Sequence, residues 1–288
     1  MTSLLTNPSA ATALAGVLGL IVGSFLNVVI LRLPARLMHS WRQQSREILE
    51  LPAEADEKAP PGIVWESSHC PQCKHPLGAA ENIPLISWIA LRGRCRHCKA
   101  PISVQYPLVE LITALGSAAV VWTFGPSYGA VAGVVLTWAL IALAGIDLRT
   151  QLLPDQLTLP LLWLGLLLSI VPIFVSPMAS IIGAAIGYLS LWSIYWLFKL
   201  VTGKEGMGYG DFKLLAALGA WMGPASLLPT VLLSSLIGAI VGGAFLAMRG
   251  KDRATPIPFG PFIAAAGWVW FVAGPQLWNV YQRVLGVA

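Results

Sequence analysis

Two aspartates, Asp147 and Asp211, stand at the ends of apolar stretches in this 288-residue chain. A carboxylate at the boundary of a membrane-length segment is energetically costly, so it marks a candidate functional site. Two such carboxylates that meet can share one proton, because like charges a few ångströms apart resist double ionisation. The ionised carboxylate could then activate water as a general base, while the protonated one polarises a carbonyl group. Such a pair would hydrolyse a peptide bond without a metal ion or a covalent intermediate.

A structural role is the alternative for each acid near the membrane boundary. Asp211 precedes an apolar run and could cap the N-terminus of a helix, and Asp155 could do the same. Asp147 ends its apolar stretch, and at a helix C-terminus the dipole opposes a negative charge, so capping of its own helix does not explain it. Serine and cysteine mechanisms are less favoured, since no Gly-x-Ser-x-Gly motif is present and all four histidines lie in one polar loop.

The composition indicates which elements position these acids. Hydrophobic residues make up 56% of the chain and charged residues 11%, and the mean hydropathy is +0.73. A soluble protein of this size could not bury so much apolar surface, so the sequence predicts an all-α polytopic membrane protein. About eight segments approach the ~20 apolar residues that a bilayer requires. They are residues 11–31, 107–124, 129–147, 156–175, 179–200, 211–225, 227–248 and 257–276.

The distribution of basic residues predicts the orientation of the chain. An even number of spans places both termini on one side of the membrane. If the termini are outside, every lysine and arginine except Arg283 lies in or beside an inner segment, as the positive-inside rule requires. Asp147 would then end the third span and Asp211 would begin the sixth, so both would lie at the cytoplasmic face. The net charge of +5 follows from this topology and does not require nucleic-acid binding.

One polar segment separates the first and second predicted spans. The predicted domains are a first transmembrane helix over 1–34, a cytoplasmic loop domain over 35–106 and a seven-helix membrane domain over 107–288. The first helix is expected to be retained, because the N-terminus lacks the basic region of a cleaved signal peptide. A short surface helix followed by a linker is expected within residues 36–66, which are polar and contain Pro60-Pro61-Gly62.

All four cysteines lie in the loop domain, in two Cys-x-x-Cys motifs separated by 21 residues. Two such motifs can complete a tetrahedral shell of four thiolates, which predicts a structural Zn²⁺ site formed by Cys70, Cys73, Cys95 and Cys98. A closed four-sulfur shell holds a small loop together and does not catalyse. A cytoplasmic location disfavours disulfides. Redox-active or unpaired thiols are the alternatives, and a nearby histidine could replace one cysteine.

Taken together, these residues resemble the bacterial prepilin peptidases, which are GxGD-type aspartic peptidases and N-methyltransferases of type IV pilus and type II secretion systems. The resemblance rests on segments in the expected order: residues 23–34, the two cysteine motifs, 82–88, 106–111, Asp147 with 153–155, 208–213 and 258–262. It implies that Asp147 and Asp211 are the catalytic pair of an intramembrane aspartic endopeptidase. It also implies cleavage of the basic leaders of prepilins and pseudopilins at the cytoplasmic side of the bacterial inner membrane. Both termini would then be periplasmic.

The resemblance further implies methylation of the new N-terminal residue, usually phenylalanine, with S-adenosylmethionine as the methyl donor. The sequence has no Gly-x-Gly-x-x-Gly motif in a strand–turn–helix context, and the soluble segment is too short for a Rossmann domain. A pocket for S-adenosylmethionine would therefore form between the cysteine loop and the membrane helices. Glu110 and Asn27 are candidates to line it, since both are polar groups in predicted spans near that loop. Interhelical hydrogen bonds explain these two residues equally well.

Other functions compete with the bifunctional enzyme. A proton-coupled membrane transporter could use acids as a relay, but the acids here lie at the inner edge and the two halves show no matching interrupted helices. A peptidase without methyltransferase activity, or a non-catalytic assembly factor held together by zinc, would share many of the same motifs.

Overall fold

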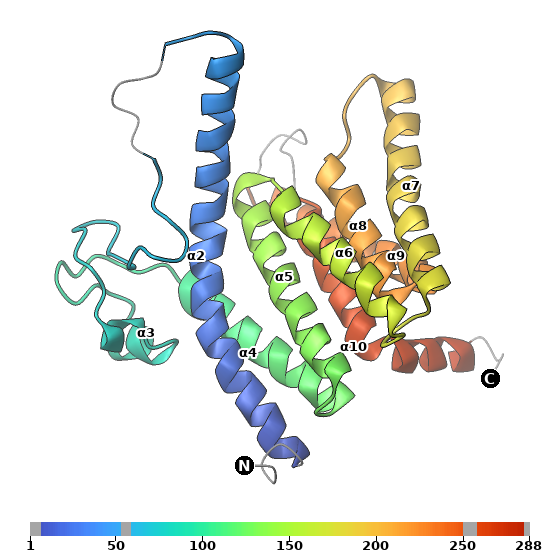
Figure 1. The fold of residues 1–288 in the computed structure, drawn as a ribbon, viewed down its shortest axis with the longest axis horizontal. Coiled ribbons are helices and arrows are strands. Elements are labelled where there is room, and N and C mark those ends of the chain that lie inside the picture. Colours follow the sequence, from blue (N-terminus) through green and yellow to red (C-terminus); the bar gives the residue numbers. More distant parts are fainter. Residues whose placement is uncertain (1–6, 53–58, 250–257, 285–288) are drawn as a thin grey trace. The chain divides into compact units, whose positions relative to one another are not determined.

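The computed structural model describes residues 7–52, 59–249 and 258–284, and over these residues the protein is helical (Figure 1). The described residues form no β-strand, only two isolated bridges, His69–Pro76 and Arg94–Pro101. The chain divides into two compact units, Met1–Ala130 and Val131–Ala288. The helical class is as predicted, whereas the two chain ends, which the predicted topology places on one side, lie outside the described residues.

The first unit consists of two long helices and a loop segment between them. Asn7 caps the first helix, since its side chain accepts a hydrogen bond from the Ser9 N–H at 3.0 Å. The loop segment carries two short helices beside the cysteine motifs. The elements are α2 (Pro8–Ile48), the 3₁₀-helix η1 (Ala79–Asn82), α3 (Ile86–Ala90) and α4 (Gln105–Phe124).

Helices α2 and α4 pack along each other through two glycines of α2. A Cβ atom on Gly19 would lie 2.7 Å from the Thr113 carbonyl oxygen, and one on Gly23 would lie 2.7 Å from the Cα atom of Glu110. Small residues at this spacing allow the backbones of two membrane helices to approach closely. The contact fixes the register in which Asn27, one turn further along α2, meets α4.

Helix α2 is longer than the span expected from the sequence. It continues through Pro34 to Ile48, so its 41 residues measure about 60 Å at 1.5 Å per residue, twice the ~30 Å hydrocarbon core of a bilayer. Proline removes one backbone hydrogen bond, but no glycine or second proline follows it before Ile48 to end the helix. The surface helix expected within residues 36–66 is therefore the far part of α2. α2 also crosses the predicted domain limit at residue 34; the domain limits stay a prediction.

In the second unit α8 packs against both α6 and α7, and it also contacts α9 and α10 (Figure 1). The Trp221 indole donates a hydrogen bond to the Leu161 carbonyl oxygen at 2.8 Å, and the Ser180 hydroxyl donates to the Ala220 carbonyl oxygen at 2.6 Å. These contacts fix α8 on two sides, and its first turn carries Asp211. The elements are α5 (Tyr128–Thr150), α6 (Asp155–Ile170), α7 (Pro177–Thr202), α8 (Tyr209–Met222), η2 (Pro224–Ser226), α9 (Leu227–Arg249) and α10 (Gly260–Val284).

Five helical segments of the described residues are long and apolar enough to cross a membrane: α2, α4, α5, α7 and Pro224–Ala244, which includes most of α9. This finding supports the predicted membrane class. Each predicted span overlaps one α-helix. However, α8 has only 14 residues, or about 21 Å, which is shorter than the hydrocarbon core. The number of eight crossings stays a prediction.

Candidate functional site

The two aspartates singled out in the sequence lie at the same end of the second unit. Asp147 is 5% exposed in the last turn of α5, and Asp211 is 7% exposed in the first turn of α8. Leu153, in the α5–α6 loop, lies close to a glycine next to each aspartate. A Cβ atom on Gly210 would lie 2.6 Å from Leu153 Cβ, and one on Gly260 would lie 3.1 Å from Leu153 Cδ1. Leu153 therefore lies beside the glycine that precedes Asp211 and beside the glycine that binds Asp147.

Asp147 is bound by the N-terminus of a different helix. The backbone N–H of Gly260, the first residue of α10, donates a buried hydrogen bond to Asp147 Oδ2 at 3.0 Å. A helix N-terminus carries unsatisfied N–H groups and a partial positive charge, so it stabilises a carboxylate. This contact explains an acid at the C-terminus of α5, and it gives Asp147 a structural role besides any chemical one. Gly260 belongs to the matched segment 258–262, but nothing in the sequence indicated this contact.

Neither Asp211 nor Asp155 is the N-cap of its helix, which was the structural role considered from the sequence. The N-cap positions are Gly208 for α8 and Pro154 for α6. Instead, Asp211 Oδ1 is buried without a hydrogen-bond partner among the described residues. A buried polar atom of this kind requires a donor, such as water or a group of a substrate.

Asp155 forms an ion pair with Lys213 between the first turns of α6 and α8. The Lys213 ammonium lies 2.6 Å from Asp155 Oδ1 and 2.8 Å from Oδ2. The side chains are 50% exposed for Asp155 and 28% for Lys213, so the pair is partly screened by solvent. Because Lys213 follows Asp211 by two positions, the ion pair supports the turn that carries Asp211.

The four cysteines of the loop segment come together. Their Sγ atoms all lie within 4.8 Å of one another, with Cys70 and Cys95 buried and Cys73 and Cys98 exposed. The backbone N–H of Cys73, directed at the Cys70 thiol, lowers the pKa of Cys70 to about 6, which favours the thiolate that a metal requires. Within the described residues the group contains no histidine. Four sulfur donors at this spacing fit Zn²⁺.

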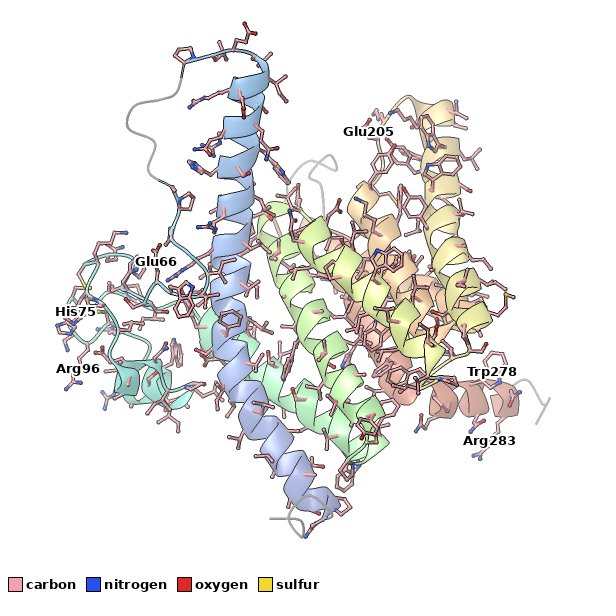
Figure 2. All side chains as sticks on the ribbon, in the orientation of Figure 1. Glu66, His75, Arg96, Glu205, Trp278 and Arg283 are labelled. Atoms are coloured by element: carbon pink, nitrogen blue, oxygen red, sulfur yellow. The ribbon has the colours of Figure 1, made fainter. Side chains whose placement is uncertain are left out.

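Two equivalent backbone turns present these thiols. In the first, the Cys70 N–H donates to the His75 carbonyl oxygen at 2.9 Å; in the second, the Cys95 N–H donates to the Ala100 carbonyl oxygen at 2.8 Å. Figure 2 labels His75 and Arg96, one on each turn. The repeated turn is the local reason why two Cys-x-x-Cys motifs direct their sulfur atoms toward one point.

A cavity of about 310 Å³ lies in the first unit, among α2, α4 and the loop segment. Asn27 and Glu110, the cofactor candidates from the sequence, both line it. Glu110 Oε2 accepts a hydrogen bond from the Leu85 N–H at 2.8 Å. Asn27 Nδ2 donates to the carbonyl oxygens of Gly23 at 3.2 Å and Tyr106 at 3.0 Å. The bond to Tyr106 joins α2 to α4, so the interhelical role considered from the sequence also holds.

Comparisons with known proteins match nearly the whole chain. Residues 17–124 match the bacterial peptidase A24 N-terminal domain, and residues 134–243 match the type IV leader peptidase family. A prepilin leader peptidase/N-methyltransferase of Xanthomonas campestris pv. campestris is 54% identical over 281 residues, which cover 98% of both chains. That of Stutzerimonas stutzeri is 55% identical, covering 97% of this chain and 96% of the relative. That of Pseudomonas aeruginosa is 52% identical, covering 98% and 97%. No solved structure matches the chain.

Proposed function

Because the chain belongs to the type IV leader peptidase family, as its motifs predicted, we propose that it is an intramembrane aspartic endopeptidase and N-methyltransferase. It would remove the basic leader from type IV prepilins and type II secretion pseudopilins, and then methylate the new N-terminal residue with S-adenosylmethionine. Relatives that are more than half identical carry the names of both activities. The observation that supports the peptidase is the burial of two carboxylates at one end of the second unit, with Leu153 beside the glycines next to both.

In the proposed cleavage, the Asp147–Asp211 pair holds one proton. The ionised carboxylate takes a proton from a water molecule, whose oxygen attacks the scissile carbonyl carbon, while the other carboxyl group gives its proton to the carbonyl oxygen. When the resulting diol collapses, the C–N bond breaks, the leaving amine receives a proton and the pair again holds one. The Gly260 N–H would keep the Asp147 carboxylate in place, and the unpartnered Asp211 Oδ1 would meet the water or the substrate.

The reaction is assigned to the cytoplasmic face of the bacterial inner membrane, with both termini in the periplasm. The basic residues support this orientation, because Arg149 and Lys213 lie beside the two aspartates and nearly all other lysines and arginines fall in the same inner segments. The enzyme is then embedded in the lipid bilayer. Its active site would lie at the edge of the bilayer, which suits a substrate whose cleavage point adjoins a hydrophobic helix. Nucleic acid is not expected as a partner.

Zn²⁺ is the metal that best fits the four-cysteine cluster. Among residues 59–104 only Cys70, Gly93 and Cys95 are buried, so the cluster is the core of the loop segment. A segment with so small a hydrophobic core needs further stabilisation, and a metal ion bound by four thiolates would supply it. The ion would therefore hold the loop in shape and leave cleavage to the aspartates.

Cleavage of a purified prepilin by the detergent-solubilised protein tests the aspartate pair. We expect Asp147→Asn and Asp211→Asn each to abolish leader removal, as followed by mass spectrometry, because each change removes a carboxylate with little change in volume. Glu205→Gln is the matched control, since Glu205 is an exposed acid in the α7–α8 loop that pairs with Lys199 (Figure 2). Cleavage at the wild-type rate by either aspartate variant would remove the pair from the mechanism.

Methyl transfer is tested on the same product with isotopically labelled S-adenosylmethionine. We expect the cleaved pilin to gain the mass of one CH₂ group at its N-terminal residue. A product that is cleaved but never labelled would leave a peptidase without methyltransferase activity, which is the alternative considered from the sequence.

A further inference from the structure

The cavity of the first unit has hydrogen-bond acceptors on two facing helices. Asn27 is 1% exposed on α2, and Glu110 is 7% exposed on α4. The rest of the lining comes mainly from the loop segment, including both cysteine-bearing turns. The volume of about 310 Å³ lies at the lower end of the range for small-molecule sites, so it suits one ligand of cofactor size.

Asn27 presents an acceptor whose orientation is fixed. Its Nδ2 group donates to the carbonyl oxygens of Gly23 and Tyr106, so a flipped amide would place its oxygen against two other oxygens. The Oδ1 atom is buried without a partner among the described residues. Such an atom is costly unless a ligand or a water molecule donates to it.

Glu110 is a buried carboxylate with a neutral partner. Its Oε2 accepts from the Leu85 N–H at 2.8 Å, and Ser24 lines the same cavity. Leu85 has φ 59° and ψ −51°, which a leucine rarely adopts and which persists only where the surroundings enforce it. A buried carboxylate is strongly stabilised by a cation, and neither of these residues supplies one.

The remaining lining offers basic and aromatic side chains. Lys74 and Arg96 come from the two cysteine-bearing turns, and Trp88 and Tyr106 add aromatic rings. The Trp88 indole N–H is held by the Ile102 carbonyl oxygen at 3.3 Å. A ligand with a cationic group, an anionic group and a flat heterocycle would find a matching side chain for each part.

We propose that this cavity binds S-adenosylmethionine and that Glu110 and Asn27 receive the cationic end of its methionine part. The ligand carries an ammonium group, a sulfonium centre and a carboxylate, and its adenine ring suits the aromatic side chains. The assignment rests on the methyl transfer proposed above and gives the methyl donor a site within the first unit. The hydrogen bonds from Asn27 to Tyr106 and from Leu85 to Glu110 then serve to position the two acceptors.

Direct ligand binding tests this site without enzyme turnover. The dissociation constants of S-adenosylmethionine and S-adenosylhomocysteine would be measured by calorimetry for the wild-type protein, Glu110→Gln and Thr113→Val. Glu110→Gln keeps the size and can still accept the Leu85 N–H, but it removes the charge. Thr113→Val is the matched control, because Thr113 is buried one turn further along α4, donates to the Val109 carbonyl oxygen at 2.6 Å and is not part of the cavity lining.

We expect Glu110→Gln to weaken S-adenosylmethionine binding at least about tenfold, as loss of a charge-assisted contact usually does, while Thr113→Val binds like the wild type. A larger loss for S-adenosylmethionine than for S-adenosylhomocysteine would identify the sulfonium as the group at Glu110, and an equal loss would identify the ammonium. Unchanged binding by Glu110→Gln would overturn the site. A wild-type protein that neither binds nor methylates would instead overturn the proposed methyltransferase.

A second measurement does not depend on how well the variants fold. Ultraviolet crosslinking of methyl-labelled S-adenosylmethionine to the wild-type protein, followed by peptide mapping, should place the label in peptides that line the cavity, such as those carrying Trp88 or Tyr106. Label confined to peptides of Val131–Ala288 would overturn the assignment.

Discussion

Substitution of Gly260 by alanine tests how Asp147 is held. A Cβ atom at this position would lie 2.6 Å from Asp147 Oδ2 and 3.1 Å from Leu153 Cδ1. Ordinary van der Waals contact begins near 3.4 Å, so the carboxylate oxygen must move by about 0.8 Å, the difference from 2.6 Å. Because the nearest obstacle is the end of a side chain and not the backbone, the fold can yield there. The added methyl group would therefore displace the Asp147 carboxylate, which is the group proposed to exchange a proton during cleavage.

The expected effect is large for the reaction and small for substrate binding. A misplacement of about 1 Å at a reacting group lowers a rate about 100-fold, and a hydrogen bond to a charged group contributes about 1.5–3 kcal/mol. We therefore expect Gly260→Ala to lower kcat for prepilin cleavage about 10- to 100-fold with little change in KM. Binding of S-adenosylmethionine should be unchanged, because Gly260 belongs to the other unit.

Gly243→Ala is the matched control for this experiment. Gly243 lies in α9 of the same unit, and a Cβ atom there would meet nothing within 4 Å. The two variants would be compared by initial rates of leader removal and by thermal unfolding. If Gly260→Ala cleaves as fast as Gly243→Ala, the position of Asp147 at the N-terminus of α10 does not matter to the reaction.

Lys213→Met should lower the free energy of unfolding by no more than about 1 kcal/mol, because its ion pair with Asp155 is partly exposed. Adding Asp155→Asn to that variant should cost little more in unfolding midpoint, and fully additive losses would contradict a direct interaction. Cys98→Ser should remove the bound zinc and expose the loop to protease, and metal analysis that still finds one ion per chain would refute the four-sulfur site. Because zinc binds thiolates and not thiols, zinc measured after dialysis should be retained at pH 7.5 and lost as the buffer is made acidic, and an ion that survives strong acid would contradict a site of four thiolates.

The features of the site that depend on residues close to one another in the sequence could be predicted from it. Each Cys-x-x-Cys turn is closed by hydrogen bonds within a few positions, so two such motifs were enough to expect one four-sulfur cluster. The order of the apolar segments was likewise enough to expect Asp147, at the end of one helix, on the same side as Asp211, at the start of another. The peptidase family followed from short motifs, which the comparisons confirm.

The features that the sequence did not indicate depend on contacts between distant segments. The partner of Asp147 is the N–H of Gly260, 113 positions away, and the bond depends on the residue at which α10 begins. The first transmembrane helix was predicted over 1–34, with a separate surface helix after it, but α2 continues without interruption to Ile48. The segment 211–225 was predicted to be one of the eight spans, yet its helix α8 has only 14 residues and packs against α6 and α7.

The glycine contact between α2 and α4 makes the first unit vulnerable at positions remote from any ligand. At Gly19 and Gly23 even a methyl group would collide with the backbone of α4 and wedge the two helices apart. Asn27 and Glu110 are carried by these helices, so the wedge would separate two walls of the cavity while the residues around both catalytic candidates stay in the other unit. A genetic screen for bacteria that assemble mature but unmethylated pilins should therefore recover bulky replacements of these membrane glycines alongside changes in the cysteine loop.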